Sequence, residues 1–151
     1  MEPTCSFEER DAQPTLSIHT SAAVQDLPGI FGEAFGAVMQ YLGQLGEHPA
    51  SMPYAAYRNM DLQDLDVEIG FPVARPLPGE GRIQPGEIPG GQWATLLHVG
   101  PYDQIHAGWE ALTAAIAATG RTIAGPAYEF YLDGPETPPE RIRTLLGHPV
   151  V

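Results

Sequence analysis

The chain has 151 residues, 43% of them hydrophobic, which is enough for one globular domain with a buried core and argues against disorder. Seven arginines and no lysine stand against 19 acidic side chains, so the formal net charge is −12 at pH 7. Such a surface repels a phosphate backbone, which disfavours direct nucleic-acid binding, while it attracts small organic cations.

No segment has the pattern of a targeting signal or a membrane span. Residues 1–10 are acidic rather than basic and then apolar, and no apolar run approaches the roughly 18 residues that cross a bilayer. We therefore expect a cytoplasmic protein without membrane contact. Residues 1–13 have little apolar periodicity and are predicted to form a flexible N-terminal segment. That segment contains the single cysteine, Cys5, so an internal disulfide is excluded.

The first predicted elements are a strand and a helix. Residues 15–20 alternate apolar and polar side chains, as in a half-buried strand. A helix follows, with Asp26 as its N-cap and Gly46 as its C-terminal stop. Its apolar stripe steps by four and three residues along Phe31, Phe35, Val38, Leu42 and Leu45. Close packing on a sheet would explain the glycines within this helix, which are Gly32, Gly36 and Gly43.

The middle of the chain is predicted to hold two strands and a loop. Residues 54–58 form a short strand, and residues 65–71 form another in which Glu68 and Phe71 lie on opposite faces. The stretch 74–91 is rich in proline and glycine and is predicted to be a loop with a short strand near Arg82 and Ile83.

The second half of the chain repeats this order. Residues 92–99 are predicted to be a strand, a helix follows and ends at Gly120, and strands are predicted over 127–132 and 144–150. The apolar stripe of this second helix is Ile105, Trp109, Leu112 and Ile116.

The strand–helix–strand–strand order therefore occurs twice, at about residues 14–73 and 92–151. An offset of 74 residues aligns tyrosines and glycines of the two copies, and it also pairs Glu129 with Ala55. Two copies indicate an internal duplication rather than a solenoid, and a cleft often lies between paired units. The second copy carries a carboxylate where the first carries a methyl group.

Glu129 is the centre of the functional hypothesis. It is predicted to share one strand face with Tyr131, while Tyr128 and Phe130 lie on the other face. A carboxylate beside aromatic rings is either a solvated strand residue or the anchor of a site for a cationic ligand. In the second case each ring can contribute roughly 0.5–2 kcal/mol of cation–π attraction, and the carboxylate supplies the compensating charge.

The remaining aromatic side chains divide into core and cleft candidates. Phe35 and Trp109 lie on helix stripes and are predicted to be buried against the sheet. Tyrosine and tryptophan side chains favour partly solvated clefts, because their polar atoms need hydrogen-bond partners. The candidates for a cleft are Tyr54, Tyr57, Trp93, Tyr102 and Tyr131. The sequence has no phosphate-binding loop, nucleophile elbow or paired-histidine zinc motif, so we expect no cofactor and no metal.

The order and spacing of four motifs resemble one known family. They are Leu-Asp-Val-Glu-Ile-Gly-Phe-Pro-Val at 65–73, His-Val-Gly-Pro-Tyr at 98–102 followed by Trp109, Gly-Pro-Ala-Tyr-Glu-Phe-Tyr-Leu at 125–132, and His-Pro-Val at 148–150. In these motifs residues 14–151 resemble the GyrI-like small-molecule-binding domain. That domain is also the effector-binding half of multidrug-sensing transcription regulators of the MerR and AraC classes.

The resemblance implies an α+β fold of two pseudo-symmetric β-α-β-β units. They would form a curved antiparallel sheet with both helices on one face and a ligand cleft on the other. In relatives a glutamate matched by Glu129 contacts lipophilic cations, with aromatic residues around it. The same resemblance suggests further ligand-binding residues, namely Tyr131, Tyr57, Glu68, Phe71, Trp93 and Tyr102. Glu68 and Phe71 are predicted to lie on opposite faces of their strand. If the polar face of that strand meets the cleft, Glu68 rather than Phe71 is the ligand-binding residue.

The resemblance is compatible with three different functions. The chain is expected to be a stand-alone member, because the domain leaves no room for a helix-turn-helix. The leading hypothesis is a binder of hydrophobic, often cationic, compounds that confers drug tolerance or senses drugs. One alternative is a hydrolase that opens the cyclopropane ring of DNA-alkylating natural products, with Glu129 as the catalytic carboxylate. The other is a protein-interaction module, for example one that modulates gyrase.

Overall fold

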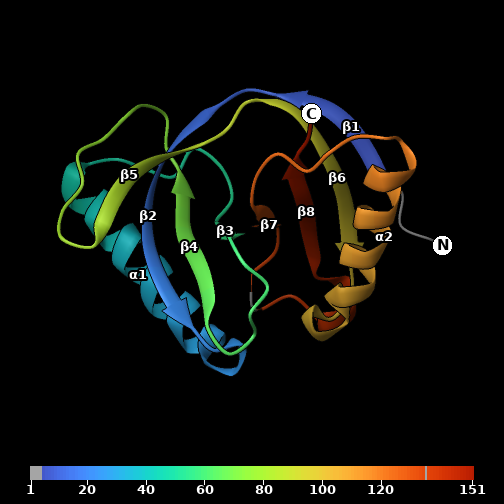
Figure 1. Ribbon diagram of the computed structural model, residues 1–151. Helices are drawn as coiled ribbons and strands as arrows, with labels where there is room; N and C mark the ends of the chain where they lie inside the picture. The colour runs from blue at the N-terminus through green and yellow to red at the C-terminus, as the bar shows by residue number, and fades with distance from the viewer. Residues whose placement is uncertain (1–4, 135) are drawn as a thin grey trace. The chain divides into compact units, whose positions relative to one another are not determined.

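The computed structural model describes residues 5–134 and 136–151, which form two compact units. Unit 1 contains residues 5–11 and 90–151, and unit 2 contains residues 12–89. Each unit combines one α-helix with four strands, and the strand pairs within each unit are antiparallel (Figure 1). The predicted α+β class is therefore confirmed.

Unit 2 is a four-stranded sheet with one helix against it. The strand order is β3-β4-β2-β5. Helix α1 lies along β2 and β4, as Figure 1 shows. The elements are β2 (Gln13–Ala22), α1 (Leu27–Leu45), β3 (Tyr54–Tyr57), β4 (Leu65–Pro72) and β5 (Ile83–Ile88).

Helix α1 begins and ends close to the predicted residues. Asp26 occupies the N-cap position, but its side chain makes no capping hydrogen bond. At the other end Gly46 adopts a left-handed φ of 71°, and its N–H donates to the Gly43 carbonyl at 3.2 Å. The predicted stripe packs inward, with Val38 and Leu42 fully buried.

The explanation offered for the α1 glycines is wrong. Gly32, Gly36 and Gly43 lie on the exposed side of the helix, and a Cβ added to any of them would meet no described atom within 4 Å. No described residue therefore packs so closely on α1 that it requires a glycine at these positions. Each of the three glycines lowers the helix propensity of α1 without gaining a packing contact there.

We expect Gly36→Ala to raise the free energy of unfolding by about 1 kcal/mol, because alanine restricts the unfolded chain and suits a helix interior. The measurement is urea unfolding followed by circular dichroism. Gly46→Ala is the matched control: the same substitution at positive φ should lower stability by a comparable amount. A stability loss in Gly36→Ala would contradict the assignment of this position to open solvent.

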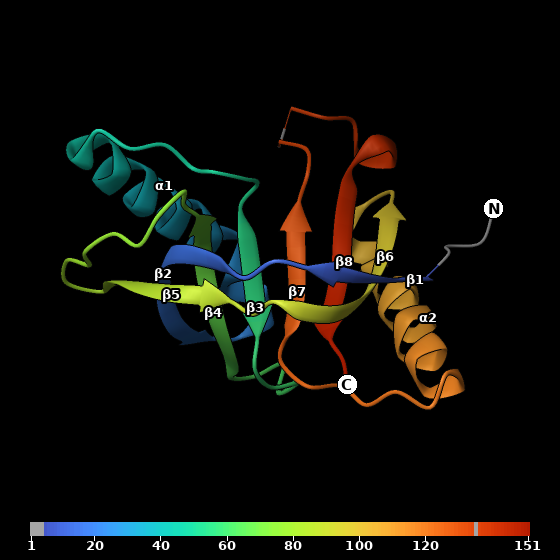
Figure 2. The same cartoon turned by 90° about the horizontal axis from the view of Figure 1, so that it is seen from above.

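Unit 1 has the same arrangement of a sheet and a helix. The strand order is β1-β6-β8-β7, and Figure 2 shows α2 alongside β6 and β8. Leu112 and Ile116 of α2 pack on Leu96 of β6 and Leu146 of β8. The elements are β1 (Cys5–Arg10), β6 (Gly91–Val99), α2 (Ile105–Ala118), β7 (Ala127–Tyr131) and β8 (Arg143–Pro149).

The repeated β-α-β-β order is confirmed, but the structural units are larger than the predicted halves. In both units the repeated core is extended by one edge strand, β5 in unit 2 and β1 in unit 1. Residues 5–10 pair with β6 and are therefore not flexible as predicted, and residues 83–88 form a longer strand than expected within the proposed loop. The prediction for residues 1–4 lies outside the described residues. Within the described ranges, no helix has the length and apolar character needed to cross a membrane.

Candidate functional site

Strand β7 in unit 1 carries Glu129 into a buried position. Glu129 is only 3% exposed, and it lies directly opposite Leu146 of β8. The alternation predicted for this strand is confirmed, because the Tyr131 side chain reaches Glu129, whereas the rings of Tyr128 and Phe130 stack on each other 5.9 Å apart. The interpretation of Glu129 as a solvated strand residue is therefore wrong.

Three neutral groups donate hydrogen bonds to the Glu129 carboxylate. The Tyr102 and Tyr131 hydroxyls both donate to Oε1, the latter at 2.8 Å, and Trp109 Nε1 donates to Oε2 at 3.0 Å. All three donors are uncharged side chains of unit 1, two phenols and one indole.

The donors come from three consecutive parts of unit 1. Tyr102 lies in a short 3-10 helix, Tyr102–Gln104, that leads into α2, and Trp109 follows seven residues later, which is about two helical turns. Tyr131 ends β7. The Tyr102 and Tyr131 rings lie 6.3 Å apart, and Tyr102 is 41% exposed. The site thus combines a buried carboxylate with aromatic rings, of which the Tyr102 ring reaches solvent.

The expected placement of the site relative to the helix is wrong. Glu129 receives a hydrogen bond from Trp109 of α2, and its cross-strand partner Leu146 belongs to the core beneath α2. The carboxylate therefore lies on the sheet face that α2 covers, not on the opposite face. Strand parity identifies which residues share a face, but it does not reveal which face a helix covers.

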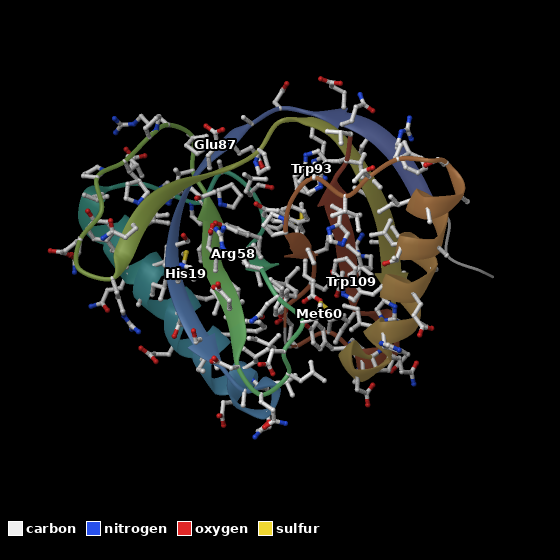
Figure 3. All side chains as sticks on the ribbon, viewed as in Figure 1. His19, Arg58, Met60, Glu87, Trp93 and Trp109 are labelled. Carbon is white, nitrogen blue, oxygen red and sulfur yellow. The ribbon has the colours of Figure 1, made fainter. Side chains whose placement is uncertain are left out.

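Trp93 lies on the other face of unit 1, away from Glu129 (Figure 3 labels Trp93 and Trp109). It is fully buried, with ring centroids 5.0 Å from Tyr128 and 6.2 Å from Phe130. The Arg10 guanidinium lies 5.6 Å from the Trp93 centroid and 5.1 Å from that of Phe130. Trp93 therefore packs with a cation from the protein itself rather than with the Glu129 group.

Unit 2 contains three of the candidates, Glu68, Phe71 and Tyr57. Glu68 accepts hydrogen bonds from the Tyr54 hydroxyl and from Arg58 Nη2, the latter at 2.7 Å. Burial and then the neighbouring Glu68 charge raise the pKa of Tyr54 above its ordinary value. Phe71 contacts Phe35 of α1 with centroids 5.5 Å apart, so Glu68 and Phe71 lie on opposite faces of β4, as predicted.

Tyr57 lies at the end of β3 and is half-buried, on the opposite strand face from Tyr54. It therefore shares a face with Phe71 rather than with Glu68, because Tyr57 pairs with Val67 on β4. Of the seven candidate residues, the structure brings Glu129, Tyr131 and Tyr102 into direct contact.

Trp109 is the site residue that sequence reasoning missed. It was assigned to the core because it lies on the apolar stripe of its helix, yet its indole N–H donates to Glu129. Two features of the sequence point to this role for Trp109. One is its spacing from Tyr102, and the other is the need of an indole N–H for a hydrogen-bond acceptor. The Trp109 ring also contacts the His148 ring edge-on, with centroids 5.4 Å apart.

We expect His148 to make the stability of the protein depend on pH. Burial lowers the pKa of His148, although backbone carbonyls around Gly125 act in the opposite direction. The folded protein thus binds this proton less readily than the unfolded chain, whose histidine titrates near about 6.5. We expect the free energy of unfolding to fall as the pH is lowered from 7.5 to 5.5, and His148→Phe to reduce that fall. Urea unfolding at both pH values measures it.

The exposed residue His106 provides the control for this experiment. Its side chain is 82% exposed and pairs with Glu110 one turn along α2. His106→Gln removes a solvent-exposed histidine from the same unit and serves as the reference for the effect of His148→Phe. An unchanged pH dependence in His148→Phe would show that burial does not bias the protonation of His148.

Within the described ranges, no group of three or more histidine, cysteine or acidic side chains is arranged to hold a metal ion. The Glu129 site combines a carboxylate with three neutral hydrogen-bond donors and their aromatic rings.

Comparison with protein families and solved structures gives a consistent result. A model of the GyrI-like small molecule binding domain matches residues 3–151. No match was found among proteins of curated function. The C-terminal domain of EcmrR is 17% identical with a TM-score of 0.84, and the match covers 100% of this chain and 99% of that domain. In an EcmrR–DNA complex the match is 18% identical with a TM-score of 0.86; it covers 98% of this chain but only 57% of EcmrR.

Two further structures share the fold. SAV2435, determined with bound tetraphenylphosphonium, is 14% identical with a TM-score of 0.69, covering 100% of this chain and 94% of that one. A hydrolase from Listeria innocua is 15% identical with a TM-score of 0.65, covering 98% of this chain and 92% of that one. At these identities the likeness to each structure is one of fold.

Proposed function

This chain belongs to the GyrI-like small molecule binding domain family, and from this premise we propose that it binds lipophilic organic cations beside Glu129. In this proposal Glu129 is the charge partner, and the rings of Tyr102, Tyr131 and Trp109 form the aromatic surroundings. The biological role would be the sequestration or sensing of such compounds.

The observation that carries the proposal is the buried Glu129 carboxylate with its three neutral donors. A carboxylate that is 3% exposed loses most of its hydration, and a nearby cation offsets that loss. The phenol and indole donors hold the carboxylate in one orientation. Aromatic rings next to it add cation–π attraction for a cation that has few hydrogen-bonding groups of its own.

The charge of the whole chain supports the same ligand class. A formal net charge of −12 raises the local concentration of cations around the protein and lowers that of anions. The relative SAV2435 was determined with tetraphenylphosphonium, a bulky aromatic cation, and this supports its use as the first probe for the present chain.

We expect ligand entry to move Tyr102. Of the three donors to Glu129 it is the only exposed one, since Tyr131 and Trp109 are half-buried. It belongs to a 3-10 turn ahead of α2 rather than to the regular helix. A ligand that approaches the carboxylate from solvent can displace the Tyr102 ring more easily than either of the other two.

The geometry favours binding over hydrolysis. A catalytic base must have a lone pair available for the proton of a water molecule. Three hydrogen bonds, two on Oε1 and one on Oε2, take up three of the about four lone-pair positions of the Glu129 carboxylate. A catalytic water would therefore have to approach Oε2, beside the Trp109 indole.

Calorimetric titration with tetraphenylphosphonium tests the proposal, with neutral triphenylphosphine oxide as the matched control. We expect saturable binding of the cation with one site, weakened by salt, and much weaker binding of the neutral compound. Equal affinity for both compounds, or no binding of the cation, would contradict the proposed function.

A further inference from the structure

Thr144 carries a buried hydroxyl next to the Glu129 group. It lies on β8 in unit 1, is 1% exposed, and its Oγ1 has no hydrogen-bond partner among the described residues. A buried hydroxyl without a partner destabilises a protein, and valine would fill the same space without that penalty. The hydroxyl therefore requires an explanation.

The strand register places Thr144 in a row of polar side chains. It is directly opposite Tyr131 of β7 and directly opposite His98 of β6. Residues paired in this way on one sheet face have neighbouring side chains, and diagonal neighbours two positions along lie about 7–8 Å apart. Glu129 is the diagonal neighbour of Thr144, two register pairs further along β7.

The polar atoms on either side of Thr144 have partners elsewhere. His98 Nε2 lies 3.1 Å from the Pro101 carbonyl oxygen, and the Tyr131 hydroxyl donates to Glu129 at 2.8 Å. The segment above this row is the start of α2, where Gly108 approaches His98 and Leu146 closely. Thr144 is thus a buried hydroxyl on the same sheet face as Glu129, and the polar atoms of His98 and Tyr131 beside it have other hydrogen-bond partners.

We propose that the Thr144 hydroxyl is a second polar contact for the ligand, so that the site selects cations that also carry a hydrogen-bonding group. The inference rests on the proposed function of the Glu129 site. A threonine hydroxyl can donate as well as accept, so a hydroxyl or a carbonyl on the ligand would satisfy it. The carboxylate provides the attraction for the charge, and Thr144 distinguishes between cations of equal charge.

The test compares two cations of the same charge and nearly the same shape. Tetraphenylphosphonium has no hydrogen-bonding group, whereas a hydroxyphenyl-triphenylphosphonium has one, and its meta and para isomers place it differently. We expect the wild type to bind the better hydroxylated isomer about threefold to tenfold more tightly than tetraphenylphosphonium. In Thr144→Val this ratio should fall to about one while the affinity for tetraphenylphosphonium stays the same.

Two variants control for effects on folding. Thr144→Ser keeps the hydroxyl and should keep the ratio. Thr15→Val makes the same change at an equally buried threonine on β2 of unit 2 and should also keep it. A change in the shape of the site or in protein stability alone would alter the affinity for both cations. The proposal requires a change in the ratio of the two affinities.

The outcomes separate this inference from the proposed function. If neither phosphonium binds to the wild type, both fail. If tetraphenylphosphonium binds but Thr144→Val leaves the ratio unchanged, or the wild type does not distinguish the two cations, only the role of Thr144 is overturned. An ordered water on Oγ1 that persists with ligand bound would also overturn it, because the water would then satisfy the hydroxyl.

Discussion

Glu129→Gln is expected to weaken tetraphenylphosphonium binding by about tenfold to a hundredfold, which corresponds to about 1.4–2.8 kcal/mol. The substitution keeps the size of the side chain but removes the only negative charge in the group formed with Tyr102, Trp109 and Tyr131. A phosphonium ion offers no hydrogen bonds, so the lost charge is the main change that it can sense. Calorimetric titration of both proteins at the same low salt concentration measures the effect.

The control for net charge is Glu110→Gln on α2. The Glu110 side chain is 71% exposed, so this variant makes the same change in total charge at a solvated position. Its effect on affinity should stay below about twofold, because exposed charges are screened. Equal affinities in the wild type and Glu129→Gln would overturn the role of Glu129 as charge partner.

Folding must be checked in the same variant. A glutamine amide has one acceptor oxygen and an NH₂ group, so at least one of the three donors to residue 129 would face another donor. We expect a loss of stability of about 1–3 kcal/mol. Since ligand affinity refers to the folded fraction, titration at a temperature where both proteins are fully folded separates the two effects.

The strand and helix faces were predictable because they depend on local periodicity. The shared face of Glu129 and Tyr131 follows from the alternation of a regular strand, and β7 is regular. The inward stripe of α2, with Leu112 and Ile116 buried, follows in the same way from the helical repeat. Such patterns do not depend on what packs against the element.

The missed features depend on partners that are distant in sequence. Trp109 resembled a core residue because its ring is apolar, and only the position of β7 turns its N–H toward Glu129. Strand β1 was overlooked although Cys5 and Phe7 alternate with exposed side chains, because its charged C-terminal half masked the pattern. Strand β5 contains Pro85, which is tolerated because β5 is an edge strand of its unit.

The two units share a topology but place their charges differently. Unit 1 has Glu129 on the face that α2 covers, whereas the equivalent position in unit 2 is Ala55. Unit 2 instead has Glu68 on the face away from α1, in an ion pair with Arg58. Glu68 thus lies in an ion pair within its own unit, whereas Glu129 accepts hydrogen bonds from two phenols and an indole of its unit. The rings of those donors supply the cation–π surface that makes the Glu129 group our candidate for an external cation.

Gly70→Ala is expected to lower the free energy of unfolding by about 3 kcal/mol or more, the largest effect on stability that we anticipate. Gly70 lies on β4, between Ser17 of β2 and Tyr54 of β3. An added Cβ would come within 2.7 Å of the Ser17 Cα and closer still to the Leu16 carbonyl oxygen. Both are backbone atoms of a paired strand, so no side-chain rotation can relieve the clash.

The equivalent glycine of unit 1 provides the matched comparison. A Cβ added at Gly147 of β8 would meet the Trp93 ring at 3.1 Å rather than backbone. Because a side chain can shift by a few tenths of an ångström, Gly147→Ala should cost less than Gly70→Ala. Urea unfolding of both variants, followed by circular dichroism, measures the difference. A Gly70→Ala protein as stable as the wild type would mean that β2 and β4 can separate at this point without loss, which their continuous register across eight residue pairs argues against.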